Sequence, residues 1–164
     1  MPDSAPDVRE QLAALLPRLR RFGRALARNR EDGDDLVQVA LEKALARTDQ
    51  WTPGTRLDSW MFRIMQNAWI DEVRARQRRG ETFVDEEEAE RAGAAIGDSQ
   101  VDAVAVRKAV AQLSDEHRAV VALVLVEGLS YEEAAAVLEV PVGTLTSRLS
   151  RAREALKAML GDAP

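Results

Sequence analysis

Two opposed faces on one C-terminal helix constrain this chain more than any other feature. From Ser130 to Leu160 the pattern predicts a short helix, a turn near Pro141 and Gly143, and a longer amphipathic helix. The longer helix repeats apolar residues every three or four positions: Leu145, Leu149, Ala152, Leu156 and Met159. Its other face is polar and cationic, formed by Thr144, Ser147, Arg148 and Arg151. This layout is typical of a helix-turn-helix unit, which packs one stripe and offers the other to a DNA groove.

The polar face therefore predicts DNA binding. We expect Arg148 and Arg151 to bond to base edges or phosphates, with Thr144 and Ser147 as shorter donors. Thr144 is also the expected cap of the second helix. An ordinary helical hairpin with a solvated face is the alternative interpretation.

The composition indicates an all-α protein. Hydrophobic residues make up 46% of the 164 residues but aromatic residues only 4%, and strong helix formers dominate. The chain has no cysteine, which excludes disulfides and thiolate metal sites and fits a reducing cytoplasm. It has neither an apolar run long enough to span a membrane nor a signal-peptide pattern. We therefore expect a soluble, cytoplasmic protein with no membrane insertion.

The net charge of −5 is concentrated in one segment. Residues 1–80 carry +3, residues 81–100 carry −6 and residues 101–164 carry −2. Local basic patches govern phosphate binding, so the acidic total does not exclude a nucleic-acid partner. It does predict weak non-specific binding to DNA.

The segment charges divide the chain into two small helical domains, residues 8–79 and 101–161, joined by an acidic linker over 80–100. In the first domain, apolar periodicity predicts one helix up to Leu26, with Pro17 as the only objection to its continuity. A second helix is expected to begin near Asp34, and a third at Asp58 or Ser59.

The second domain should begin with a helix over residues 101–113. Ser114 is then a candidate N-cap, and Ser130 with Glu133 matches a capping box. Residues 119–126, AVVALVLV, fit either a buried strand or a buried helix. The cap before them and Gly128 after them favour the helix.

The third helix of the first domain offers another candidate surface. Asn67, Asp71, Arg74 and Arg78 are spaced four, three and four residues apart and share one face. The arginines would attract a phosphate backbone. Trp51, Trp60 and Trp69 lie nearby in the sequence, and aromatic rings beside cations suit unstacked bases. Trp60 falls on the apolar stripe and is better explained as a core residue.

Enzymatic chemistry has little support in this sequence. Glu31, Asp32, Asp34 and Asp35 form an acidic cluster, but their spacing fails the calcium-loop pattern. Helix capping by Asp32 or Asp34 is the favoured interpretation. His117 is the only histidine, and a glycine-rich phosphate loop is missing. We therefore expect no enzyme, no metal and no cofactor.

Four segments in this order resemble the extracytoplasmic-function (group IV) sigma factors of bacterial RNA polymerase. They are DDLVQVALEKAL (34–45), LDSWMFRIMQNAWIDEVRARQRR (57–79), LSDEHRAVVALVLVEGLSYEEAA (113–135) and VPVGTLTSRLSRAREAL (140–156). The resemblance covers most of the chain outside the termini and linker. LRRFGRALARNREDGDDLVQ (19–38) is in addition similar to the general-stress type, which implies a role in the stress response.

The resemblance implies a role for each part of the chain. It implies docking of the first domain on the β′ clamp of core RNA polymerase through Asp34, Asp35, Leu36 and Gln38. It implies recognition and melting of the −10 promoter element by Trp51, Asn67, Asp71, Arg74 and Arg78. The second domain would hold the β flap and read the −35 element through Thr144, Ser147, Arg148 and Arg151. A transcription factor of this kind also implies an anti-sigma partner.

Some positions depart from the family pattern. Val39 stands where many relatives carry an acid, and Thr146 and Ser150 stand where some place an arginine or an aromatic residue. The promoter sequence therefore cannot be transferred from those relatives. By analogy, Asp85 to Glu88 of the linker would imitate nucleic-acid charge near the RNA exit path.

Two other functions compete with this interpretation. A sigma-like mimic would sequester an anti-sigma factor without touching DNA, and would have no need of Asn67, Arg148 or Arg151. A stand-alone helix-turn-helix repressor would leave the tryptophans and the basic third helix unexplained and would normally be a dimer. The sequence leaves open whether the two domains contact each other.

Overall fold

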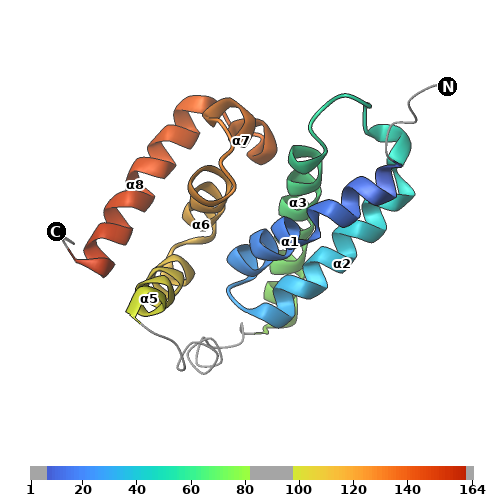
Figure 1. Cartoon of the computed structure of the whole chain (residues 1–164). Coiled ribbons are helices and arrows are strands. Elements are labelled where there is room, and N and C mark those ends of the chain that lie inside the picture. Colours follow the sequence, from blue (N-terminus) through green and yellow to red (C-terminus); the bar gives the residue numbers. More distant parts are fainter. Residues whose placement is uncertain (1–6, 82–97, 162–164) are drawn as a thin grey trace.

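The structure, a computed structural model, describes residues 7–81 and 98–161. Every regular element within those ranges is helical (Figure 1). The first half contains α1 (Val8–Ala27), α2 (Arg30–Ala46), the short 3₁₀ turn η1 (Thr48–Gln50) and α3 (Leu57–Arg79). The second half contains α5 (Asp98–Gln112), α6 (Asp115–Val121), the π-helical turn η2 (Ala122–Val126), α7 (Tyr131–Leu138) and α8 (Val142–Leu160). The predicted all-α class is confirmed, whereas the acidic segment Asp85 to Glu88 lies outside the described residues.

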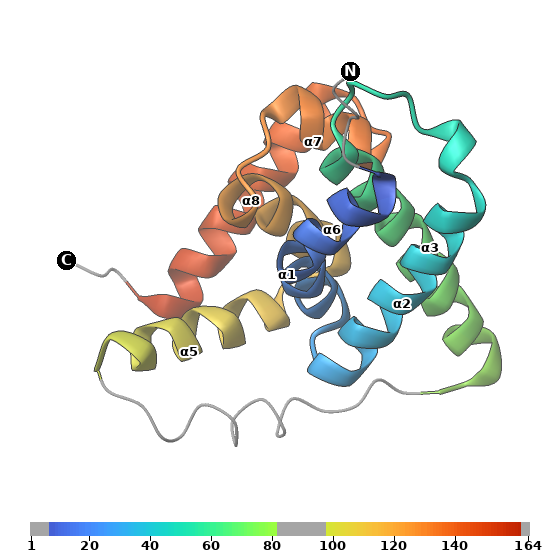
Figure 2. The ribbon, with the colours of Figure 1, turned by 45° about the vertical axis from the view of Figure 1, so that its right-hand side comes forward.

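The two halves pack against each other. Helix α1 lies beside α6 and η2, and α3 lies beside α7, so that α1 stands between α2 and α6 (Figures 1 and 2). One cluster of buried apolar side chains runs through both halves, including Phe22, Phe62, Leu123 and Leu145. The rings of Phe22 and Phe62 lie 4.8 Å apart between centroids. The described conformation is therefore closed, with a shared core.

Helix α1 runs without interruption through Pro17, which is exposed. The missing N–H costs one helical hydrogen bond, but the position faces solvent and the buried residues on the other side of the helix hold it in place. The helix ends at Arg28, whose backbone is left-handed with φ 71° and whose N–H bonds to the carbonyl of Arg24.

Helix α2 begins at Arg30, so the predicted start near Asp34 was wrong. The cap is Asn29, whose side chain accepts a 2.8 Å hydrogen bond from the N–H of Asp32. The prediction that Asp32 or Asp34 caps the helix was wrong for the same reason. Both acids lie inside the helix, and they form ion pairs with Arg76 and Arg24.

Gly33, which looks like a helix breaker in the sequence, lies inside α2 at the point where α1 passes very close to it. A Cβ on Gly33 would lie 2.7 Å from the backbone N and Cα of Arg24. A Cβ on Gly23 would lie 2.7 Å from the carbonyl oxygen of Gly33. Such distances leave no room for a methyl group, so the crossing of α1 and α2 requires glycine on both sides.

The caps in the second half follow the predictions except at α8. Ser114 caps α6 and Ser130 with Glu133 forms the capping box of α7, as predicted. Residues 119–126 are helical, which confirms the helix over the strand. The predicted cap Thr144 was wrong, because α8 begins at Val142 after the extended Pro141 and already contains Gly143. The turn instead uses Glu139 in the left-handed region, with φ 56°.

Replacement of Gly33 by alanine should destabilise the fold by about 1–3 kcal/mol, because the new methyl group must push α1 away from α2. Gly143→Ala is the matched control. Apart from the nearby backbone of α8 itself, no atom lies within 4 Å of the position that a Cβ on Gly143 would occupy. We expect it to preserve or slightly raise stability. Urea unfolding measures both, and equal stability of Gly33→Ala and the original chain would refute the close crossing.

The ion pair of Asp32 with Arg76, at 2.7 and 3.0 Å, joins α2 to α3. Hydrogen bonds from Arg76 lower the pKa of Asp32 below its ordinary value of 3.8, burial opposes them, and Asn29 assists. A carboxylate whose pKa is lower in the folded than in the unfolded state stabilises the fold. This contribution is complete at a pH above the pKa of the unfolded state, and it is lost as the pH falls through the pKa of the folded state.

Asp32→Asn should therefore lower stability at pH 7 by about 1.5–3 kcal/mol and flatten its decline between pH 5 and pH 3. Thermal melts across that range measure both effects. Glu81→Gln is the control, because Glu81 bonds to Arg79 at an exposed position. If the difference in melting temperature between Asp32→Asn and the original chain were the same at every pH, the assignment would be contradicted.

Candidate nucleic-acid interface

Helices α7 and α8 form the predicted helix-turn-helix. Leu145, Leu149 and Ala152 of α8 are buried, which places the apolar stripe against the rest of the second half. Met159, at the end of the same stripe, is 38% exposed. Ser147 and Arg151 are exposed and face away from the core. They form a polar surface free to meet DNA.

Arg148 and Thr144 are less exposed than the other two predicted contacts. Both are half-buried, and Arg148 Nη2 stands 3.5 Å from Glu116 Oε1 at the start of α6. Arg148 also borders a groove shared with α3. In this conformation the four predicted −35 residues do not form one open face.

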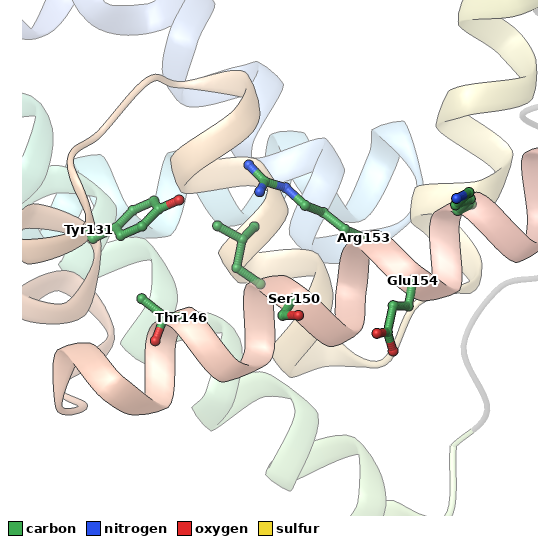
Figure 3. A pocket seen from close by; sticks show the side chains of 7 residues that line it. Tyr131, Thr146, Ser150, Arg153 and Glu154 are labelled. Atoms are coloured by element: carbon green, nitrogen blue, oxygen red, sulfur yellow. The ribbon is translucent and has the colours of Figure 1, made fainter. Parts of the chain in front are cut away.

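A shallow pocket of about 260 Å³ lies on the other flank of α8 (Figure 3). Tyr131 of α7 borders it, and Thr146, Ser150, Arg153 and Lys157 contribute a row along α8. Arg153 extends toward the side of Tyr131, whereas Glu154 points away from it (Figure 3). Thr146 and Ser150 were noted in the sequence only as departures from the family pattern, and Arg153 and Lys157 were not singled out. The spacing of four, three and four residues could have indicated this second polar stripe.

Helix α3 presents the second predicted surface. Asn67, Asp71, Arg74 and Arg78 are all exposed, as their spacing requires of residues on one outward face. Arg76 belongs to another face, where it pairs with Asp32 and Glu72 and lies 5.7 Å from the ring centroid of Trp69. The basic end of α3 thus divides into arginines that hold the fold and arginines that face solvent.

The tryptophans are less accessible than the sequence indicated. Trp51 is 8% exposed and Trp69 is 4% exposed, so both rings belong to the core in this conformation, and Trp60 is half-buried against it. The indole N–H of Trp51 is buried without a hydrogen-bond partner. A base could stack on Trp51 only after the loop around it moved.

The predicted polymerase-docking residues occupy two faces of α2. Asp35 and Gln38 are exposed, and Asp34 is paired with Arg24 at its edge. Leu36 is buried, with 5% exposure, and supports the helix from the core side. Val39 is 42% exposed and adds an apolar residue to the outer face.

A groove of about 410 Å³ separates α3 from the second half of the chain. Its walls include the apolar residues Trp69, Ile70, Val73, Ala119, Leu138 and Val140. Arg74 of α3 and Arg148 of α8 both border it. Two predicted DNA contacts from different halves of the chain therefore share one narrow groove.

Two charged residues that the sequence analysis did not single out join the halves. Arg118 of α6 is 1% exposed and donates to the carbonyls of Ala25 and Leu26 at 3.0 and 2.8 Å. Glu127 follows η2, and its buried carboxylate accepts from Arg18 and Arg21 of α1. No local motif marks these contacts between the halves, since the partner groups in α1 lie about 90 to 110 positions away.

Comparisons with known proteins agree with the arrangement of the helices. Residues 12–66 match the family model described as the sigma2 domain of PhyR, and residues 103–156 match sigma-70 region 4. ECF RNA polymerase sigma factor EcfG of Rhodopseudomonas palustris is 36% identical over 159 residues, which cover 93% of this chain and 84% of that protein. ECF RNA polymerase sigma factor SigW of Bacillus subtilis is 30% identical over 82% of this chain and 78% of its own length.

A solved structure is similar over nearly the whole chain. It is the sigma factor RpoE in complex with the anti-sigma factor NepR from Bartonella quintana, with a TM-score of 0.81 and 32% sequence identity. The match covers 98% of this chain and 100% of that one.

Proposed function

Because the chain belongs to the ECF family of RNA polymerase sigma factors, we propose that it initiates transcription by reading −35 DNA with α8 and melted −10 DNA with α3. It is a transcription initiation factor that binds core RNA polymerase and promoter DNA, and it is not an enzyme. The observation that carries the residue assignment is the exposure of Arg151 on one helix and of Asn67, Arg74 and Arg78 on another.

The −35 element would be read by the exposed side of α8. Arg151 can reach a base edge or a phosphate, and Ser147 is a shorter donor one turn earlier. Arg148 and Thr144 join this face once Arg148 leaves Glu116. Binding of a recognition helix in the major groove suits these side chains.

The −10 element would meet α3. Asn67 can hydrogen-bond to an unstacked base, and Arg74 and Arg78 can hold the neighbouring phosphates. Asp71 shares the face and would repel phosphate, so it limits where the strand can run. Trp51 would contribute only from a rearranged loop, given its burial.

Helix α2 is the proposed docking site on the β′ clamp, with Asp35 and Gln38 in direct contact and Asp34 beside them. The exposed positions of Asp35, Gln38 and Val39 support this assignment. We place the protein in the cytoplasm, where its polymerase works. None of the described helices is both long and apolar enough to cross a bilayer.

An anti-sigma factor is the proposed regulatory partner. The similar sigma factor from Bartonella quintana was solved with its anti-sigma factor NepR. The resemblance of residues 19–38 to the general-stress type extends this proposal to a role in the stress response.

A sigma-like mimic is the second candidate, because residues 12–66 match the family described as the sigma2 domain of PhyR, and PhyR from Bartonella quintana is an anti-anti-sigma factor solved in complex with NepR. Transcription separates the two. We would add the purified chain to core polymerase and measure run-off transcripts from a library of promoters of its own genome. New specific transcripts establish the sigma function, whereas absence of core binding would favour the mimic.

Arg151→Ala should weaken binding of the holoenzyme to −35 DNA by about 1–3 kcal/mol, the range for loss of one base contact. Competition with promoter fragments that carry or lack the −35 element measures this loss. Arg107→Ala is the control, since Arg107 is an exposed arginine of α5 outside the proposed face. An equal loss on both fragments would show that Arg151 only attracts phosphate.

Asn67→Ala should reduce promoter melting about 10-fold or more, because a flipped base loses a hydrogen-bonded contact of about 1–3 kcal/mol. Formation of the closed complex should change little, since duplex binding rests on α8. Permanganate reactivity of unpaired thymines reports melting, and gel shifts at low temperature report the closed complex. Loss of closed complex equal to that of Arg151→Ala would refute this division of roles.

A further inference from the structure

The carboxylate of Glu127 is completely buried between the two halves of the chain. Its side chain has no exposed surface, and three arginine nitrogens donate to it: Arg18 Nε at 3.1 Å, Arg21 Nε at 2.7 Å and Arg21 Nη2 at 2.8 Å. Both arginines belong to α1, whereas Glu127 belongs to the second half. We call these three residues the clasp.

The clasp continues into a longer series of charges. Arg18 also donates to Asp58 Oδ2 at 3.0 Å, and Asp58 accepts from Arg56 at 2.7 Å. Arg56 in turn pairs with Glu133 of α7, which returns the series to the second half. Near the C-terminal end of α1, Arg118 donates to the carbonyls of Ala25 and Leu26. Cations there also complement the negative end of the helix dipole.

A buried ionic contact of this kind is favourable in the closed and the open state, and unfavourable in a partly opened state between them. When the halves are together, Glu127 is desolvated and its charge is balanced by α1. When they are apart, water hydrates the carboxylate and both guanidinium groups. A partly opened state would leave a charge buried without a partner, at a cost of several kcal/mol. The clasp therefore favours a fully closed or a fully open chain.

The closed chain is too small to bind both promoter elements. Their positions at −35 and −10 are about 25 base pairs apart, or roughly 85 Å along B-DNA. A compact chain of 164 residues has a radius of gyration of about 15 Å and a diameter of roughly 40 Å. In addition, Arg74 and Arg148 face a groove of about 410 Å³, which cannot admit a duplex.

We propose that Glu127, held by Arg18 and Arg21, locks the free chain in a closed form that cannot engage promoter DNA and must open when the polymerase binds. This inference rests on the proposed function. It adds a self-inhibitory contact within the chain, separate from any anti-sigma factor. Only the open fraction binds, so the apparent dissociation constant for core polymerase equals the intrinsic one divided by the open fraction, and the clasp weakens binding by making that fraction small.

The test uses the full chain and two substitutions on opposite sides of the clasp. Glu127→Gln keeps the shape but removes the charge, and Arg21→Gln removes one of the cations. Glu139→Gln is the matched control, because it makes the same chemical change in the exposed pair of Glu139 with Arg63, which also bridges the halves. Titration with core polymerase gives the apparent affinity of each variant.

We expect Glu127→Gln to bind core polymerase about 10- to 100-fold more tightly and Arg21→Gln about 3- to 10-fold more tightly. Glu139→Gln should change the affinity less than about 5-fold. The two clasp variants change the net charge in opposite directions, so a shared gain cannot come from simple attraction to the polymerase. Unchanged or weaker binding by both would overturn the proposal.

Single-molecule energy transfer in the free chain gives an independent measure. The sequence has no cysteine, so Glu31→Cys and Gln112→Cys can carry the two dyes. Both positions are exposed, and they lie close together in the closed form, since Arg28 donates to the carbonyl of Leu113. We expect high transfer in the original chain, and a low-transfer population at least 10-fold larger in Glu127→Gln.

The two measurements also separate this proposal from the proposed function. If the original chain neither binds core polymerase nor supports transcription, the sigma function fails, while energy transfer still shows whether the clasp holds the halves together. If transcription works but the free chain shows low transfer, the clasp is refuted and the sigma function stands.

Discussion

The burial of charged side chains between the two halves is the constraint on which the rest of the structure depends. The side chains of Glu127 and Arg118 have almost no exposure. Glu127 is paired with two arginines of α1, and Arg118 donates to two carbonyls of α1 as well as to groups of its own half. A buried charge without such partners would cost several kcal/mol, more than most single contacts contribute. The position of α1 against α6 therefore determines where the second half sits, and with it the groove beside α3.

The same constraint decides which cations can meet nucleic acid. The chain has 23 lysines and arginines and a net charge of −5, so DNA contacts must come from a local surface. Arg18, Arg24, Arg76 and Arg118 balance acids or carbonyls inside the fold. Arg74, Arg78 and Arg151 are exposed on α3 and α8. An acidic protein can thus present two basic surfaces while other arginines hold its helices together.

Sequence patterns with a local physical cause were reliable. The capping box at Ser130 and the N-cap at Ser114 form because their donors lie three residues away. The exposed row on α3 follows from helical spacing alone. The errors had different causes. Gly33 looked like a helix breaker, but α1 crosses α2 so closely there that only glycine fits. Thr144 does not cap α8 because the helix already begins at Val142. Trp51 and Trp69 are buried, since only tertiary packing decides which aromatic rings the core takes.

By itself, the sequence determined the all-α class, the helix-turn-helix and the resemblance to sigma factors, because periodicity and capping act within a few residues of the chain. Only the tertiary structure decided that the halves close on each other, that Arg148 faces Glu116, and that Glu127 lies between Arg18 and Arg21. These contacts join residues up to 109 positions apart. The sequence does not indicate whether the partner of a charged side chain will be water, DNA or another residue. Burial in the tertiary structure decides that.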